Sequence, residues 1–576
     1  MLEDLPEFVY NTLIDQHLCD LDVKALRLVS KQCKSLIDIN ITALTPRDFP
    51  KNEYWEVLKL FKNLESLDLT QHRQSVIGVY EAGFDHLTAL TRLKSLKVER
   101  DHNLQLLLKV IDHGKLTCLE TFHYKSAGAL EDQYLESLCC MSNLRELSLS
   151  GSSGVRLSAD YNGITGAGLM SLKRLATLRS LDVSRCSQMN EGGLMSLAHL
   201  SQLTALNANF IGIPSELALG SQATRAVPNV LQLLSYLTGL QKLELRSSYI
   251  IPHQALLDGL ASLSRLTHLD VESEDWNDPP IEGSALLKLR ELRVLRAGGW
   301  PVYFDTQAAS SCGSGPAALA LTELSASPWM HKDHDVLLHA ALRGGRLQAL
   351  QLAGNRCYVI HGGTPQLWTQ ATTLTSLKFL QCNADELQEL RRLPQLKSLT
   401  FQGCEYDDPE QLHHLSTLTN LETLCFDDAR DQIFCHNSAT WISPMIIEVS
   451  HDFRRRLSAL TQLTALGLAH LGVKDTELKA IRHLKRLRTL KLGNGIFKGE
   501  GLRVLTALTA LRSLSLDSCS NLTDEGLRSV VAPLSLHSLA DVNVFGCTRL
   551  TRLSSAESMG IVCCRISGMS SAQLDR

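Results

Sequence analysis

The feature that most constrains this sequence is a leucine spacing that recurs along nearly its whole length. Near the C-terminus, Leu487, Leu490 and Leu492 have the spacing Leu-x-x-Leu-x-Leu, and an equivalent set begins at Leu511. The last two leucines of a set alternate with polar residues, which predicts a short strand with one buried face. The segment between the two sets contains GLRVLTAL, whose apolar residues have helical spacing. One such unit cannot bury its own apolar face, so it needs neighbours.

The same register continues through about eighteen units, mostly separated by roughly 22 to 29 residues. The first leucines of these units are Leu64, Leu93, Leu119, Leu144, Leu178, Leu203, Leu240, Leu266, Leu292, Leu321, Leu347, Leu374, Leu396, Leu421, Leu463, Leu487, Leu511 and Leu539. This pattern resembles a leucine-rich repeat. The predicted fold class is therefore α/β, a leucine-rich-repeat solenoid with a curved parallel sheet inside and helices outside.

Composition and charge exclude several classes of partner. The formal net charge of -4 and the pI near 6.6 do not indicate binding to nucleic acid or to an acidic membrane surface. A basic stretch around Lys479 to Lys491 is interpreted as solvated helix faces and repeat rims, with a modest anion-contacting patch as the alternative. The N-terminus, MLEDLPEFVY, lacks the features of a signal peptide, and no run approaches the roughly 18 apolar residues of a membrane span. We expect a cytoplasmic or nuclear protein.

Cysteine usage supports the repeat register. The 16 cysteines are spread over the chain without a secretion signal, so reduced thiols are expected. Five of them occupy one repeat position, where the chain turns inward after the strand and a small buried group is favoured. These five are Cys186, Cys382, Cys404, Cys519 and Cys547. The position is typical of cysteine-containing leucine-rich repeats, a subclass that in eukaryotes often accompanies an F-box.

Residues 1–40 have apolar spacings that predict two or three short amphipathic helices. One interpretation is a helical cap over the open end of the solenoid. The order of residue types also resembles an F-box over about residues 2–40: Leu5-Pro6, Ile14 and Leu18, Asp22-Val23, Leu28 to Lys31, then Leu36. Phe8 and Cys33 depart from the usual pattern, which commonly has an acidic residue and an aromatic residue there.

The F-box resemblance implies that this chain is a substrate-recognition subunit of an SCF-type cullin ubiquitin ligase. Its partners would then be a Skp-type adaptor, through it a cullin, and a protein substrate marked for ubiquitination and proteasomal degradation. The adaptor-binding residues implied are Leu5, Pro6, Val9, Leu13, Leu18, Leu21 and Val29. The alternatives are a non-ligase scaffold in cytoskeletal or ciliary assembly and a regulator of another enzyme.

The predicted organisation has four parts: an F-box-like module at 1–40, a linker and capping helix at 41–62, the solenoid at 63–550, and a C-terminal tail or cap at 551–576. Three repeat intervals are stretched, and each surplus follows a strand, so the insertions are expected on one edge. The longest contains Phe434, Trp441 and Met445, which would contact a partner or fold back on the solenoid.

The strand residues between and after the second and third leucines are predicted to line the concave face and to bind a protein substrate. Their alternative role is to keep an exposed sheet soluble. The candidates are Asp68, Lys97, Glu99, His123, Lys125, Asp182, Asn207, Asn209, Lys242, Glu244, Arg246, His268, Asp270, Glu272, Arg296, Lys491 and Asp517.

No linear signature of catalysis, phosphate binding or zinc binding is present in the sequence. The nearest clusters are His331, His334 and His339, and the pair Cys435-His436, and neither has a recognisable third partner. We therefore expect no catalytic residues, no cofactor and no metal, and a chain that is not itself an enzyme.

Overall fold

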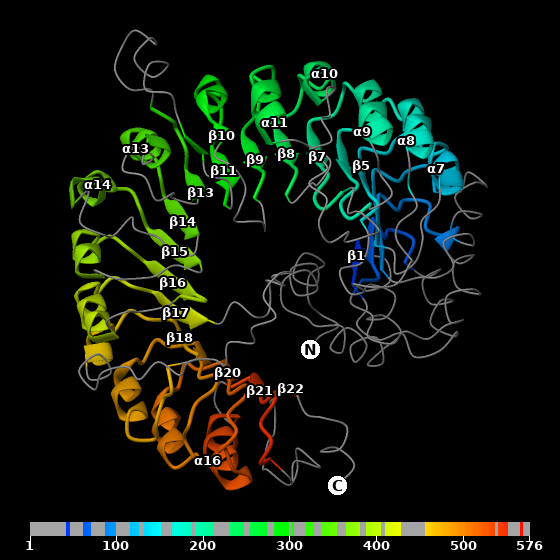
Figure 1. Cartoon of the computed structure of the whole chain (residues 1–576). Coiled ribbons are helices and arrows are strands. Elements are labelled where there is room, and N and C mark those ends of the chain that lie inside the picture. The colour runs from blue at the N-terminus through cyan, green and yellow to red at the C-terminus, as the bar shows by residue number, and fades with distance from the viewer. Residues whose placement is uncertain are drawn as a thin grey trace, which may run out of the picture. The chain divides into compact units, whose positions relative to one another are not determined.

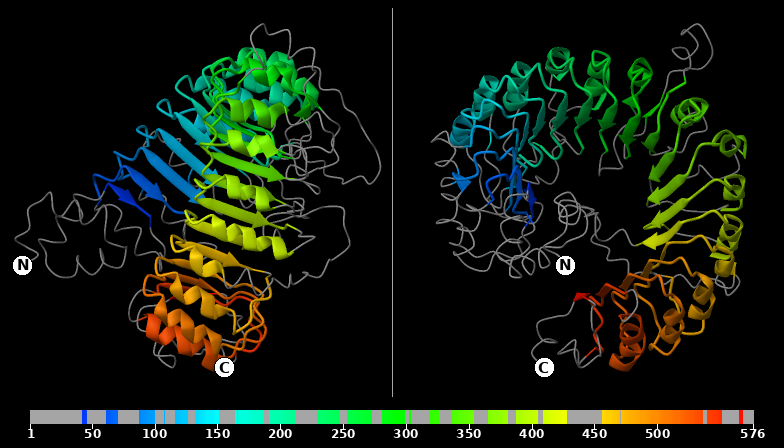
Figure 2. Two further views of the ribbon diagram at one scale, coloured as in Figure 1. Left: turned by 90° about the vertical axis from the view of Figure 1, so that its left-hand side faces the viewer. Right: turned by 180° about the vertical axis from the view of Figure 1, so that it is seen from behind.

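A computed structural model describes residues 42–45, 61–70, 87–99, 107, 116–125, 132–150, 164, 166–186, 191–211, 230–246, 253–272, 281–298, 302–303, 318–326, 336–353, 365–380, 387–404, 409–427, 456–469, 471–535, 539–550 and 565–567 (Figure 1). The chain forms two compact units, Met1–Val271 and Glu272–Arg576. In each unit, short strands alternate with short helices, as further views show (Figure 2). The boundary lies inside the segment 63–550 that was predicted as one solenoid.

The predicted leucine register is confirmed. Each of the first leucines, from Leu64 to Leu539, is at most 2% exposed. The backbone N–H of this leucine commonly closes a turn onto the carbonyl three residues earlier, as from Leu64 to Phe61 at 3.0 Å and from Leu487 to Leu484 at 3.1 Å. Each fully buried leucine stabilises the fold by about 1.5 to 3 kcal/mol. Each unit has an α/β leucine-rich-repeat solenoid fold built on this ladder.

Unit 1 contains a ladder of parallel strands in which each strand pairs with the next one in the sequence. Equivalent repeat positions align across it, so that Leu67 pairs with Leu96 and Leu96 with Phe122. A slip of one residue would turn every one of these side chains to the opposite face, which fixes the register. The strands are β1 (Ala43–Leu44), β2 (Ser66–Asp68), β3 (Ser95–Glu99), β4 (Thr121–Lys125), β5 (Glu146–Ser148), β6 (Ser180–Asp182), β7 (Ala205–Asn207), β8 (Lys242–Glu244) and β9 (His268–Asp270).

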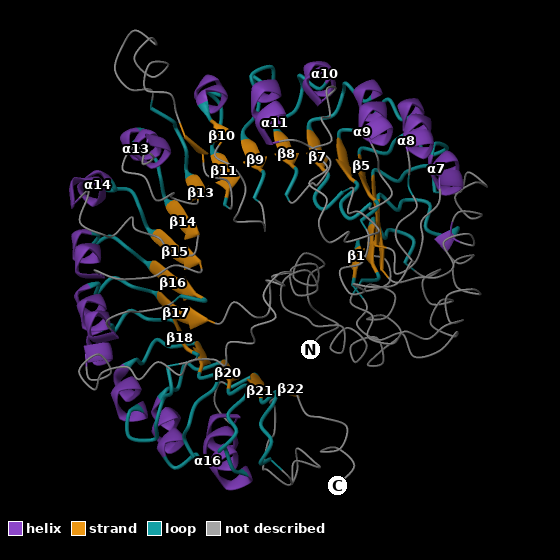
Figure 3. Cartoon of the chain, in the orientation of Figure 1, coloured by secondary structure: helices purple, strands orange, loops and turns teal. Residues whose placement is uncertain are grey.

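The helices of unit 1 lie on one side of this ladder (Figure 3). Helices this short are marginal in isolation. They depend on an apolar stripe against the sheet, such as Leu256, Leu257 and Leu260, each at most 1% exposed. The helices are α7 (Asp132–Leu138), α8 (Gly166–Ser171), the 3-10 helix η1 (Leu172–Arg174), α9 (Glu191–Ser196), the 3-10 helix η2 (Leu197–His199), α10 (Val230–Tyr236) and α11 (His253–Leu260).

Unit 2 repeats this arrangement with its own parallel ladder. Its strands are β11 (Val294–Ala297), β13 (Glu323–Ala326), β14 (Ala349–Ala353), β15 (Ser376–Leu380), β16 (Ser398–Gln402), β17 (Thr423–Asp427), β18 (Ala465–Leu468), β19 (Thr489–Lys491), β20 (Ser513–Ser515), β21 (Asp541–Asn543) and β22 (Arg565–Ser567). A separate parallel pair joins β10 (Ile281–Glu282) to β12 (Val302–Tyr303).

The helices of unit 2 are again short and lie on one side of its ladder (Figure 3). Many are 3-10 helices, a tighter form that is used in short pieces. They are η3 (Ser284–Lys288), α13 (Val336–Arg343), α14 (Pro365–Gln370), η5 (Leu387–Arg392), η6 (Pro409–Thr417), η8 (Leu457–Ala459), η9 (Leu478–His483), η10 (Gly501–Ala507) and α16 (Asp524–Ser535).

Three buried phenylalanines extend the core of unit 2 from repeat to repeat. Phe379, Phe401 and Phe426 lie in register on β15, β16 and β17. Their rings are stacked, with centroids 5.2 Å apart for the first pair and 5.0 Å for the second. Each ring is at most 3% exposed. Stacked aromatic pairs add about 0.5 to 1.5 kcal/mol beyond burial of their area.

A left-handed residue turns the chain inward after several strands. It is the residue before the predicted cysteine position, and it has φ 63° at Arg185, 61° at Gly403, 57° at Ser518 and 72° at Gly546. Its N–H donates across the repeat boundary, as from Ser518 to the Phe545 carbonyl at 2.6 Å. The turn therefore satisfies a backbone group at the end of the ladder.

The cysteines after this turn have the predicted structural role. Cys186, Cys519 and Cys547 are at most 2% exposed. The thiol of Cys519 donates to the Leu492 carbonyl at 3.1 Å, and that of Cys547 donates to the Leu516 carbonyl at 3.0 Å. Burial raises the pKa of Cys186, so it stays a neutral thiol at physiological pH. Cys404 is partly exposed, and Cys382 lies outside the described residues.

Two strands lie where the sequence did not predict repeat structure. β1 falls in the segment 41–62 that was predicted as a linker and capping helix, and it pairs with β2. β22 falls in the tail 551–576 and pairs with β21. Neither segment carries the full leucine spacing, so only the neighbouring strand could reveal the pairing. The F-box-like residues 1–40 and the predicted edge-loop residues Phe434, Trp441 and Met445 lie outside the described residues.

Replacing the central aromatic ring of the stack tests the core. Phe401→Ala is expected to destabilise unit 2 by about 3 to 5 kcal/mol, because it removes both buried area and two ring contacts. The control is Thr400→Ala on the opposite face of the same strand, where about 0.5 kcal/mol or less is expected. Urea unfolding followed by circular dichroism measures both. Equal unfolding midpoints for the two variants would contradict the assigned register.

The left-handed turn gives a second test. Gly546→Ala is expected to lower stability by about 1 to 2 kcal/mol, because an L side chain at φ 72° is strained. Gly546→Asn should be milder, since asparagine tolerates this conformation and Asn494 adopts φ 55° in another repeat. Thermal melting of both variants decides the point. If the asparagine variant is as unstable as the alanine variant, backbone strain is not the cause.

Candidate partner-binding face

The strand face is the surface formed by strand side chains that point away from the helices. In strands such as β4, β15, β16 and β17, buried residues alternate with partly exposed ones. The outward residues of neighbouring repeats come into line because the strands pair in register. Strand spacing in such a ladder is about 4.8 Å, close enough for direct contact between side chains.

In the first part of unit 1, the strand face carries isolated polar pairs. His123 Nε2 lies 3.0 Å from Glu146 Oε1 on the next strand. The hydroxyl of Ser148 donates to Asp182 at 2.8 Å, and the other oxygen of Asp182 accepts the Ser184 N–H at 2.9 Å. These pairs fix each carboxylate in one direction.

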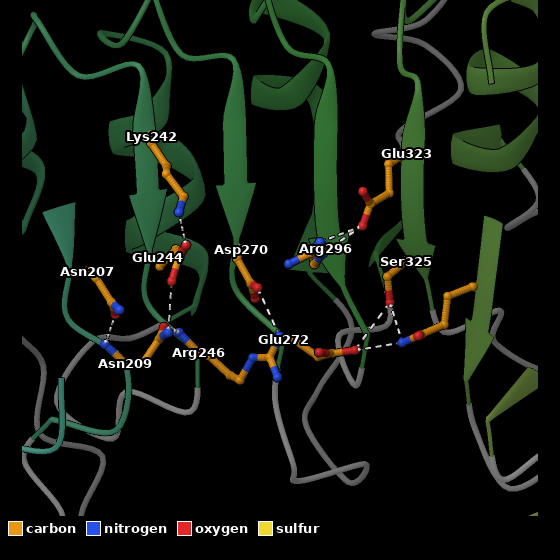
Figure 4. Close-up of polar contacts among 11 residues, drawn as sticks. Asn207, Asn209, Lys242, Glu244, Arg246, Asp270, Glu272, Arg296, Glu323 and Ser325 are labelled. Carbon is orange, nitrogen blue, oxygen red and sulfur yellow. Dashed lines mark hydrogen bonds and ion pairs between the residues drawn. The ribbon is translucent and has the colours of Figure 1, made fainter. Parts of the chain in front are cut away.

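Further along unit 1, the pairs join into a continuous chain of contacts (Figure 4). Glu244 accepts the Lys242 ammonium at 2.6 Å and the Asn209 amide at 3.2 Å. The side-chain oxygen of Asn209 accepts the Arg246 N–H at 2.6 Å. The Arg246 guanidinium in turn donates to Asp270 at 2.9 Å. The Asp270 side chain is 8% exposed and the Arg246 side chain is 34% exposed. A buried carboxylate therefore holds a partly exposed cation.

Unit 2 begins with a second cluster (Figure 4). One Glu272 oxygen accepts the Ser325 hydroxyl at 3.2 Å and the Gln351 amide at 3.1 Å. Glu272 passes over Gly298, where an added Cβ would come within 2.6 Å of the carboxylate oxygen. The glycine is therefore required for this long reach across repeats. Beside it, Arg296 Nε donates to Glu323 at 2.7 Å.

Later in unit 2, the Lys491 side chain extends across a neighbouring strand whose outward residue is a glycine. Lys491 Nζ lies 3.6 Å from Asp427, with the strand of Gly467 between theirs. Cys425 lies next to Gly467, and burial raises the pKa of its thiol to about 11. In the following repeats, Ser515 donates to Asp517 at 2.6 Å, and the Asn543 amide donates to Ser515 at 3.2 Å.

The structure places the predicted site residues on the strand faces of the two units or directly after their strands. Glu99 lies in β3, but its side chain is outside the described set. Asp270 is only 6% exposed, so its carboxylate serves Arg246 and is largely withdrawn from solvent. The partly or fully exposed members are Asp68, Lys97, His123, Lys125, Asp182, Asn207, Asn209, Lys242, Glu244, Arg246, His268, Glu272, Arg296, Lys491 and Asp517.

Several members of these clusters were missed from the sequence. They are Glu146, Glu323, Ser325 and Gln351, each at an outward position two or four residues after the first leucine of its repeat. The register alone could have found them. Their partners could not be assigned, because Glu272 contacts a residue 79 positions away.

The strand face of each unit presents side chains that form hydrogen bonds and ion pairs with one another. Among the described residues, no group of His, Cys, Asp and Glu side chains is arranged to hold a metal ion. No helix in the described ranges has both the length and the apolar character needed to cross a membrane. The polar side chains are instead held in fixed directions by one another, which suits hydrogen bonding to a large surface.

Comparison with known proteins adds no assignment. No family model matches the chain, and no curated protein matches it in sequence. Among solved structures it aligns with an internalin from Listeria monocytogenes at 16% identity and a TM-score of 0.28, over 85% of this chain and 92% of that one. It also aligns with TLR13 in a complex with ssRNA13 at 16% identity and a TM-score of 0.35, over 92% and 71%. The repeat assignment depends on the buried ladder described above.

A double-mutant cycle tests the central pair of unit 1. Arg246→Met should lower stability by about 1 to 3 kcal/mol, because it leaves the buried Asp270 carboxylate without its cation. Adding Asp270→Asn should recover part of this loss, since a neutral amide is less costly to bury. Urea unfolding of the single and double variants gives the coupling energy. Simple additivity of the two changes would contradict a direct interaction.

Proposed function

We propose that this chain is a non-catalytic protein-recognition subunit, whose strand face captures a protein substrate for an SCF-type ubiquitin ligase. The observation that carries the recognition role is the ordered, sign-mixed network of Lys242, Glu244, Asn209, Arg246 and Asp270. Preorganised polar groups lose little side-chain entropy when they bind a partner. A surface of this breadth and polarity fits a protein ligand.

The ligase role is supported by the sequence. Residues 2–40 resemble an F-box, with Leu5-Pro6 at its start, and the cysteine-containing repeats often accompany that module in eukaryotes. On this proposal, the leading residues bind a Skp-type adaptor and through it a cullin. The chain then acts by position, because it raises the effective concentration of a substrate lysine near the conjugating enzyme.

Affinity purification of the full chain with mass spectrometry tests both parts. The wild-type chain should capture the adaptor, the cullin and at least one further protein. The double variant Leu5→Ala, Pro6→Ala should lose the adaptor and cullin, while the further protein stays bound. The reverse pattern is expected for Lys242→Glu, His268→Glu, which changes two exposed strand-face residues.

The matched control is Lys173→Glu, Arg174→Glu, which places two glutamates on the exposed side of η1 in unit 1. This variant should keep every partner. A wild-type chain that binds a strand-face partner without any adaptor would favour the alternative of a non-ligase scaffold. If the strand-face variant and the control variant lose the same proteins, the strand face is not the binding surface.

A further inference from the structure

A basic edge lies outside the strand face of unit 2. We define it as Lys485, Arg486, Arg488 and Arg512, which lie in the turns leading into β19 and β20. All four residues are exposed. They belong to the segment 456–512, whose sequence holds eleven Lys and Arg residues and three acidic ones. This segment is strongly positive in a chain whose formal net charge is -4.

The acidic residues of the segment do not neutralise the basic edge. The carboxylate of Asp475 accepts the N–H groups of Lys498 at 2.9 Å and Gly501 at 2.7 Å. Glu477 accepts the Lys474 N–H at 2.6 Å. The third, Glu500, is at the N-terminal end of η10. Among the described residues, none of the four basic-edge side chains forms an ion pair with a carboxylate.

Two of these side chains contact neutral acceptors. The Lys485 ammonium donates to the Ala507 carbonyl at 2.9 Å, and the Arg486 guanidinium donates to the Gln462 side-chain oxygen. Such contacts orient the cations but leave their charge uncompensated. Lys485 and Arg486 are therefore oriented and still attractive to an anion.

The register of the ladder brings two of the arginines together. Arg488 and Arg512 hold the same position in consecutive repeats, and the Arg512 N–H donates to the Arg488 carbonyl at 2.8 Å. Their Cα atoms are thus about one strand spacing apart, roughly 4.8 Å. Like charges this close repel one another. A ligand with closely spaced negative charges would relieve that repulsion.

The chemistry of the edge favours one class of anion. Arginine forks match both carboxylates and phosphates in a bidentate geometry, so the other side chains near the edge distinguish the two. Sequence-tolerant binding of single-stranded nucleic acid needs aromatic side chains for stacking. Tyr236 and Phe545 are the large apolar side chains that are exposed in the described part of the chain, and neither lies on this edge. Attraction of a basic patch to an anionic membrane surface contributes only about 1 kcal/mol per Lys or Arg, and stable membrane binding needs a second contribution such as inserted apolar groups.

We propose that the basic edge binds an acidic segment of a partner protein, with Asp or Glu residues close together in sequence. The site is separate from the strand face and does not depend on the ligase proposal. Arg486, Arg488 and Arg512 each contact a carboxylate of the segment, and Lys485 adds general attraction. Because the cations are exposed, binding weakens as salt is added.

Fluorescence anisotropy with the full chain and a labelled peptide of alternating Glu and Ser tests the proposal. The variant Arg486→Glu, Arg488→Glu should bind about tenfold or more weakly, because it replaces attraction with repulsion. The control is Arg343→Glu, Arg346→Glu in the same unit. Arg346 directly precedes Leu347 as Arg486 directly precedes Leu487, and both control arginines are exposed.

The control variant should bind the peptide like the wild type, and a matched Gln and Ser peptide should not bind. Equal weakening by both variants would overturn the proposal. Binding of a single-stranded oligonucleotide or of anionic lipid vesicles in place of the acidic peptide would overturn it as well. Should the test variant melt at a lower temperature, Arg486→Gln, Arg488→Gln must still show a smaller loss in the same direction.

Discussion

The structure depends on burial of the leucine ladder between adjacent repeats. A strand of three to five residues and its short helix could not be stable alone, because neither buries enough apolar surface. Stacking in register supplies that surface to every repeat except those at an open end. The left-handed turn residues and the buried cysteine thiols complete the arrangement, since they satisfy carbonyl groups that the ladder leaves at the ends of strands.

The same register produces two different surfaces. Outward residues within and just after the strands align across repeats and form the paired networks of the strand face. Residues just before the strands align at an edge, where Arg488 and Arg512 are neighbours and no carboxylate in the described part of the chain forms an ion pair with them. Charged side chains of the strand-face networks pair with one another, whereas the described basic-edge side chains do not pair with carboxylates. This difference in charge pairing, more than overall composition, separates the kinds of ligand that each can bind.

Much of the fold could be predicted because the repeat is local. The positions of the buried leucines and the inward role of Cys186, Cys519 and Cys547 follow from spacing within one unit. What escaped prediction was weakly patterned or long-range. β1 and β22 form because a neighbouring strand offers unpaired backbone groups, and their own sequences lack the full spacing. Glu272 reaches Gln351 because Gly298 leaves room, a relation that spans several repeats.

The sequence by itself determined which side of each strand is buried, since a period of two between leucine and polar residues allows one register. It also determined which residue types face outward. Only the tertiary structure decided which of those residues are satisfied by one another. Asp270 is withdrawn beneath Arg246, while Arg488 stays exposed beside Arg512. The physical reason is that a side chain's partner comes from another repeat, and stacking sets its distance and direction.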